Sequence, residues 1–116
     1  MKFQELGDID TLRSVTPLNT IRLGKTRYKV GDIVQAYDKA TDTNLTIAIT
    51  KIITNNPSSI LRNHARYNHS VISNNISIAN APHWLRKRLT QRYHSHLVKR
   101  TVQATAIYFQ IVDNKE

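Results

Sequence analysis

The chain has 116 residues, a formal net charge of +9 and no cysteine. Its length suits a single domain spanning residues 1–116, and the missing cysteine excludes disulfide bonds and thiolate chemistry. No apolar run approaches the roughly 20 residues that a membrane-spanning helix needs, and the first residues lack the apolar core of a signal peptide. We therefore expect a cytoplasmic protein with no membrane partner.

The first elements in chain order are short. Residues 2–6 predict a strand or an ordered lead-in, and residues 8–15 predict a short helix with Asp8 as its N-terminal cap. That helix should end at Thr16, because the residue before Pro17 avoids the helical region of the backbone.

A β-hairpin is the clearest prediction in the first half of the chain. Residues 20–23 predict a strand, and Gly31-Asp32 supplies a turn before a second strand at residues 33–37. Both faces of that second strand carry apolar side chains, so we expect burial on much of both sides. Residues 45–53 alternate most regularly and should pair with residues 33–37 as an antiparallel hairpin.

The region from residue 54 to residue 80 is rich in Asn, Ser and His. The pair Asn56-Pro57 predicts a helix that begins at Pro57 and is capped by Asn56. The stretch SVISNNISIANAP, residues 70–82, is ambiguous between a short strand and a loop.

The last third of the chain predicts a basic helix and a closing strand. The helix begins near Pro82, and its apolar residues recur at spacings of three and four: Trp84, Leu85, Leu89, Tyr93 and Leu97. Residues 101–112 predict a long strand, central in its sheet because residues 107–112 are almost continuously apolar. The element order favours an α+β fold, a small β-barrel with two or three flanking helices.

Positive charge is concentrated in one part of the chain. Every acidic residue lies in residues 1–42 or 113–116, so residues 43–112 carry nine lysines and arginines and no carboxylate. Internal ion pairs cannot cancel such a field, which would attract a polyanion. We expect RNA or another single-stranded nucleic acid as the partner. The alternatives are an acidic protein, or a basic surface that only keeps the protein soluble.

Four stretches follow one another in a recognisable order: TIRLGK (residues 20–25), YKVGDIV (residues 28–34), TIAITKI (residues 46–52) and YFQIV (residues 108–112). Together they resemble the ASCH domain, a family within the PUA-like barrel folds. The likeness is good over residues 19–53 and acceptable over residues 101–112, whereas residues 54–100 match only in general layout. It implies a PUA-like barrel with a cleft that binds RNA or modified nucleosides.

Some members of that family are hydrolases that remove an acyl group from acetylated cytidine. Their sequences contain a pattern similar to Lys-x-x-Thr-x-Arg. The threonine is the nucleophile, and a distant glutamate is its partner. Thr20 and Arg22 match this pattern, but Pro17 stands where the lysine is expected and no glutamate occurs between Glu5 and Glu116. Thr20 is therefore a candidate catalytic residue, but the lysine and the glutamate that would activate its hydroxyl are missing from the sequence pattern. Other members are described as ribonucleases, so enzyme activity stays open.

The candidate nucleic-acid contacts form two groups. Arg22, Lys25, Arg27 and Lys29 would line one wall of the cleft, and the basic helix would supply the other wall through Arg86, Lys87, Arg88, Arg92 and Tyr93. Arg88 and Arg92 are four residues apart and share a helix face. The alternatives are a structural role for Arg22, solvated lysines and arginines elsewhere, and packing of Trp84 and Tyr93 in the core.

The histidines do not predict a metal site. His94 and His96 are two positions apart on a helix and would point about 200° apart. His64 and His69 have no cysteine and almost no carboxylate near them in the sequence. We expect no metal and no cofactor, although one unassigned histidine is open as a general acid or base in a metal-free nuclease.

Overall fold

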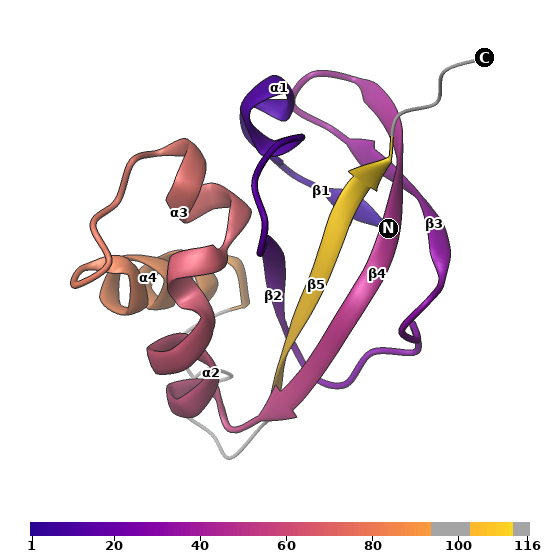
Figure 1. The fold of residues 1–116 in the computed structure, drawn as a ribbon. Coiled ribbons are helices and arrows are strands. Elements are labelled where there is room, and N and C mark those ends of the chain that lie inside the picture. The colour runs from indigo at the N-terminus through magenta and orange to yellow at the C-terminus, as the bar shows by residue number, and fades with distance from the viewer. Residues whose placement is uncertain (94–102, 113–116) are drawn as a thin grey trace.

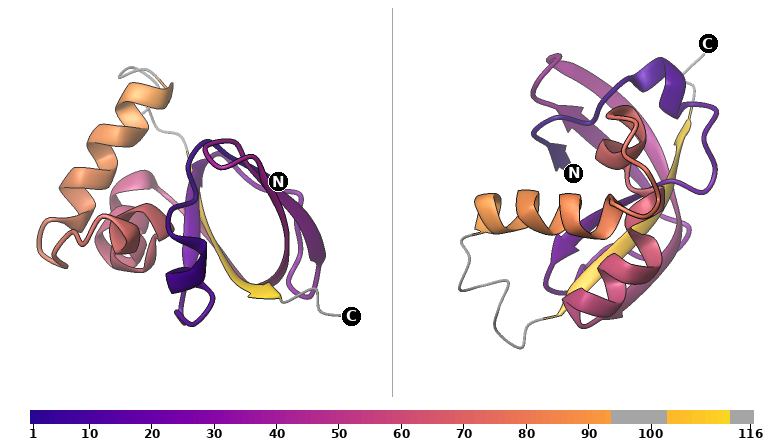
Figure 2. Two further views of the ribbon diagram at one scale, coloured as in Figure 1. Left: turned by 90° about the horizontal axis from the view of Figure 1, so that it is seen from above. Right: turned by 90° about the vertical axis from the view of Figure 1, so that its left-hand side faces the viewer.

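Five strands form one sheet that curls into a half-barrel, and helices lie against one side of the curl (Figures 1 and 2). The computed structural model describes residues 1–93 and 103–112. The elements are β1 (Lys2–Phe3), α1 (Ile9–Leu12), β2 (Asn19–Leu23), β3 (Ile33–Asp38), β4 (Thr43–Asn55), α2 (Pro57–His64), the 3-10 helix η1 (Ala65–Tyr67), α3 (His69–Ser73), α4 (Ala81–Tyr93) and β5 (Ala104–Val112).

The sheet has the strand order β1-β3-β4-β5-β2. The predicted hairpin is confirmed, since β3 and β4 pair antiparallel with Ala36 opposite Leu45. The closing strand β5 is central, as predicted, and runs antiparallel to both β4 and β2. Strand β1 pairs with β3 in parallel and forms one edge of the sheet, while β2 forms the other.

The expectation that the strand at residues 33–37 is buried on both sides was wrong. Ile33 is 66% exposed, whereas Ala36 is buried. Val34 and Ala36 point into the curl of the sheet, so Ile33 and Gln35 point to its outer face. The apolar cluster under the helices contains residues of β2, β4 and β5 but none of β3, so this outer face has no covering layer within the described part of the chain.

Capping residues explain where the helices begin. Asp8 accepts a hydrogen bond from the Thr11 backbone at the start of α1, and Asn56 caps α2 as predicted. Residues 70–82 are neither strand nor only loop, because Ser70 to Ser73 belong to α3. Asn68 accepts from the Ser70 backbone and starts this helix. The described residues hold four α-helices and one 3-10 helix, more than the two or three expected.

Strand β5 separates two apolar clusters. Ala104, Ala106 and Tyr108 face the helices, where they meet residues of α2 and α4. Ile107 and Phe109 point into the curl of the sheet and meet residues of β1, β3 and β4. Successive side chains of β5 thus alternate between the two clusters. The described residues do not include Leu97 of the predicted basic helix, nor Thr101 and Val102 at the start of the predicted strand.

The two edge strands β1 and β2 come together at what we call the seam. Arg22 on β2 donates a hydrogen bond to the Lys2 carbonyl oxygen on β1 at 2.8 Å. Its guanidinium carbon also lies 5.1 Å from the centre of the Phe3 ring. A side chain, instead of a backbone ladder, thus joins the two edges of the half-barrel. None of the described helices is long and apolar enough to cross a bilayer.

Candidate functional site

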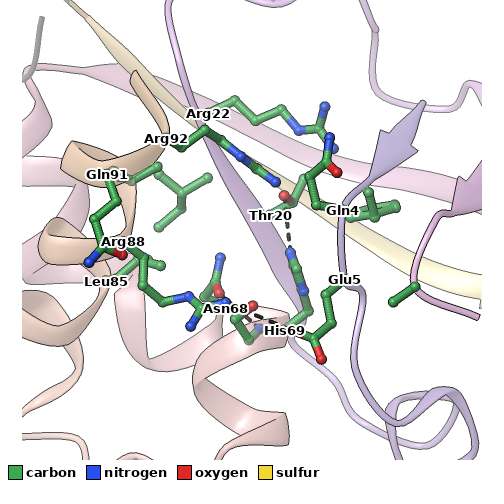
Figure 3. A pocket seen from close by; sticks show the side chains of 15 residues that line it. Gln4, Glu5, Thr20, Arg22, Asn68, His69, Leu85, Arg88, Gln91 and Arg92 are labelled. Atoms are coloured by element: carbon green, nitrogen blue, oxygen red, sulfur yellow. Dashed lines mark hydrogen bonds and ion pairs between the residues drawn. The ribbon is translucent and has the colours of Figure 1, made fainter. Parts of the chain in front are cut away.

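A pocket of about 790 Å³ opens at the seam (Figure 3). Residues 3–5, at the end of β1, and residues 20–22 of β2 line one side of it. Ala40, residues 68–70 at the start of α3, and one face of α4 line the rest. Segments from five separate parts of the chain therefore build this pocket, and three of the predicted cations line it: Arg22, Arg88 and Arg92.

Thr20 and His69 form the buried polar part of the pocket wall. The Thr20 Oγ1 atom lies 3.4 Å from His69 Nε2, and His69 Nδ1 lies 2.7 Å from the Leu6 carbonyl oxygen. A carbonyl oxygen only accepts hydrogen bonds, so Nδ1 carries the ring proton and donates it. In the neutral ring Nε2 is then an acceptor, and the Thr20 hydroxyl donates to it.

Burial keeps the His69 ring neutral. Desolvation lowers the pKa of His69 to about 4, and the positive charges of Arg22 and Arg92 act in the same direction. The Leu6 carbonyl and Asp38 oppose the shift but do not cancel it. At neutral pH the imidazole therefore accepts the hydrogen bond of the Thr20 hydroxyl. It carries no positive charge and is a weak base.

Arg22 has a double role in the geometry of the pocket. One terminal nitrogen is engaged with the Lys2 carbonyl, but its Nε atom is buried and has no hydrogen-bond partner among the described residues. Desolvation lowers the pKa of Arg22, and nearby Arg92 lowers it further. Arg22 thus has a structural role, because it joins β2 to β1. Its Nε atom is still without a hydrogen-bond acceptor among the described residues at the pocket.

The two arginines of α4 differ in their surroundings. The Arg88 guanidinium lies 3.9 Å from a Glu5 carboxylate oxygen and stacks 4.8 Å from the centre of the Trp84 ring. Arg92 has no hydrogen bond or ion pair within residues 1–93 and 103–112. In Figure 3 the Arg92 and Arg22 guanidiniums point toward the same end of the pocket. Within the part of the chain that the structure describes, no carboxylate pairs with the guanidiniums at that end.

The structure does not bring the first predicted group of cations together at the pocket. Lys25, Arg27 and Lys29 are exposed on the connector between β2 and β3, and they do not line the pocket. The physical reason is that Gly24, with a φ of +88°, turns the chain away at the end of β2. Of that predicted group, the pocket contains Arg22.

The remaining predicted residues of α4 face elsewhere. Arg86 donates a hydrogen bond to Ser58 Oγ on α2, Lys87 is exposed, and neither lines the pocket. Tyr93 is partly buried against the cluster on the helix side of the sheet, together with Trp84. Both aromatic residues therefore pack against this cluster, and contact of Tyr93 with nucleic acid stays a prediction. The helix turns only the face with Arg88 and Arg92 toward the seam.

Sequence reasoning missed Glu5, Asn68 and the place of His69. Glu5 lies in the same pocket as Thr20, although no acidic residue was expected there. Leu6 and His69 are 63 positions apart, and no local pattern predicts their contact. The buried Asn68 side chain was recognisable only as a potential helix cap. These residues come together because α3 packs over the seam.

The described residues contain no group of three His, Cys, Asp or Glu side chains that could hold a metal ion. His64 Nδ1 instead lies 2.7 Å from the Tyr108 hydroxyl. His94 and His96 lie outside the described residues.

Comparisons with protein-family models, with curated proteins and with solved structures found no match to this chain. The resemblance to the ASCH domain therefore rests on the quoted sequence stretches alone and stays a prediction.

Proposed function

We propose that this chain is a PUA-like domain of the ASCH type that binds single-stranded RNA through the pocket at the seam. The observation that carries the proposal is the charge of this pocket: Arg22, Arg88 and Arg92 line it, and Glu5 is the one carboxylate among the described residues of its wall. Planar guanidinium groups suit phosphate oxygens, to which they donate paired hydrogen bonds. The acid-free sequence from residue 43 to residue 112 would add attraction over a longer range.

The pocket also offers contacts for the uncharged part of a nucleotide. Leu85 and Leu89 contribute apolar surface, and Gln4 and Gln91 contribute amide groups on the side toward solvent. Amide side chains can donate and accept hydrogen bonds at the edges of bases. The arginines would then supply affinity, and these neutral groups would supply any preference among bases.

The test uses end-labelled single-stranded RNA at several salt concentrations without metal. If the three arginines together neutralise about three negative charges of the RNA, a plot of log affinity against log salt concentration should have a slope of about −2. Arg92→Gln should make that slope less steep by about 0.7. Arg62→Gln is the matched control, because Arg62 is exposed on α2 and outside the pocket. RNA that is never retarded, or equal losses in the two variants, would refute the proposal.

A hydrolase on the same fold is the second candidate, either a ribonuclease or an amidohydrolase acting on acetylated cytidine. The contact between Thr20 and His69 favours it, because a hydroxyl beside an oriented imidazole is the usual arrangement of an activated nucleophile. The pKa of His69, lowered to about 4, weakens it as a base and places this candidate second. Turnover that disappears in Thr20→Val would support the hydrolase, and RNA recovered intact would exclude the ribonuclease.

A further inference from the structure

We infer that the pocket takes a single nucleoside phosphate, and that in RNA this is the phosphorylated end of a strand. The inference rests on the proposed function and makes its ligand specific. The size of the pocket is its first support, because about 790 Å³ lies within the range of roughly 300–1,000 Å³ that single small ligands occupy. One nucleotide is a ligand of this class.

The placement of charge distinguishes an end from the middle of a strand. Arg22 and Arg92 point toward the same end of the pocket, and the positive charge of Arg92 lowers the pKa of Arg22. The two guanidinium groups therefore repel each other. An internal phosphodiester carries one negative charge, whereas a terminal phosphate monoester carries about 1.5 to 2 at neutral pH. Arg22 and Arg92 have no carboxylate partner within residues 1–93 and 103–112, so together they match a terminal phosphate better than an internal one.

Arg88 lies at the other end and is already engaged. Its guanidinium is close to Glu5 and stacked on Trp84, so its charge is partly balanced. The nucleoside would lie between the two ends, against the apolar surface of Leu85 and Leu89.

The pocket does not continue into a basic groove along the connector. Lys25, Arg27 and Lys29 are exposed outside it, so the charges nearest in sequence to Arg22 do not extend the pocket wall. A strand that entered by its end would need only this pocket. A strand bound along its length would need a track on both sides of it.

The test compares one short RNA sequence as a linear strand with a 5′-phosphate, a linear strand with a 3′-phosphate, a linear strand with neither, and a closed circle. The circle and either phosphorylated strand contain equal numbers of phosphates, so they differ only in having an end. Nucleoside monophosphates and the corresponding nucleosides are titrated separately. We expect a phosphorylated linear strand to bind about tenfold more tightly than the circle or the unphosphorylated strand.

The variants assign that preference to the pocket. Arg92→Gln should abolish it, and Arg62→Gln, which removes the same charge outside the pocket, should leave it intact. Arg92 is exposed on α4 and has no partner within the described residues, so its removal should not disturb folding. Circular dichroism of both variants checks this.

Each outcome separates the inference from the proposed function. Equal binding of circle and phosphorylated strand would overturn the inference and leave RNA binding in place. A preference that survives Arg92→Gln would overturn the assignment to this pocket. Nucleoside monophosphates that bind through Arg92 while no RNA binds would overturn the proposed function but support the ligand. Failure of all probes would overturn both.

Discussion

The buried imidazole of His69 should make the stability of this protein sensitive to acid. Both states hold the ring neutral above pH 6.5, so it has no effect on the free energy of unfolding there. Below that pH the unfolded chain takes up a proton that the folded chain, with the pKa of His69 lowered to about 4, does not accept. The difference corresponds to about 3 kcal/mol of unfolding free energy, lost as the pH falls from 6.5 to 4.

The perturbation that isolates this effect is His69→Phe. Phenylalanine preserves a ring beside Phe3, whose ring meets that of His69 edge to face at 5.1 Å. It removes the hydrogen bonds to Leu6 and Thr20, which should cost about 1–3 kcal/mol at neutral pH. It also removes the proton uptake, so the variant should lose less stability than the natural sequence when the pH falls.

The assay is urea unfolding at several pH values between 7 and 4, followed by the fluorescence of Trp84, the one tryptophan of the chain. Other titrating groups, including His64, are present in both proteins and cancel when the two pH profiles are subtracted. The difference between the profiles should grow by about 3 kcal/mol from pH 7 to pH 4. Parallel profiles would refute the conclusion that His69 is buried in its neutral form.

Two further pairs of substitutions probe packing and backbone geometry. Phe109→Ala should lower the free energy of unfolding by about 3–5 kcal/mol, because Phe109 is 1% exposed, whereas Val112→Ala at the exposed end of the same strand should change it by less than about 0.5 kcal/mol. Gly7→Ala should destabilise more than Gly24→Ala in the same urea assay. Both glycines have positive φ, but only at Gly7 would the new Cβ collide with Ser73, and equal losses would contradict this.

The parts of the fold that could be predicted depend on signals carried by neighbouring residues. The hairpin followed from the alternation around Leu45 to Ile49, and α2 followed from the pair Asn56-Pro57. The helix α3 was missed because its start depends on the Asn68 cap, while its residues resemble a strand as much as a helix. The exposure of Ile33 depends on where the helices pack, since they cover β2, β4 and β5 but not the outer face of β3, and no local pattern records this.

The candidate site was predictable only in part, for a related reason. Charge counting identified Arg22, Arg88 and Arg92 as candidate contacts, but it selected the exposed connector lysines equally well. Which cations share a pocket depends on how α4 packs against the seam. Glu5 and His69 join the site through contacts between distant segments, and such contacts appear only once the chain has folded.

The position of β5 in the sheet constrains how this chain folds during synthesis. β5 lies between β4 and β2 although it is the last strand in the sequence, so β2 has no partner strand until β5 is made. Before residue 104 leaves the ribosome, the hairpin and the helices can form, but the backbone of β2 stays unpaired and the interior of the curl lacks Ile107 and Phe109. Because hydrophobic surface and unpaired strand edges promote aggregation, nascent chains of this protein should be clients of ribosome-associated chaperones until the last strand is inserted.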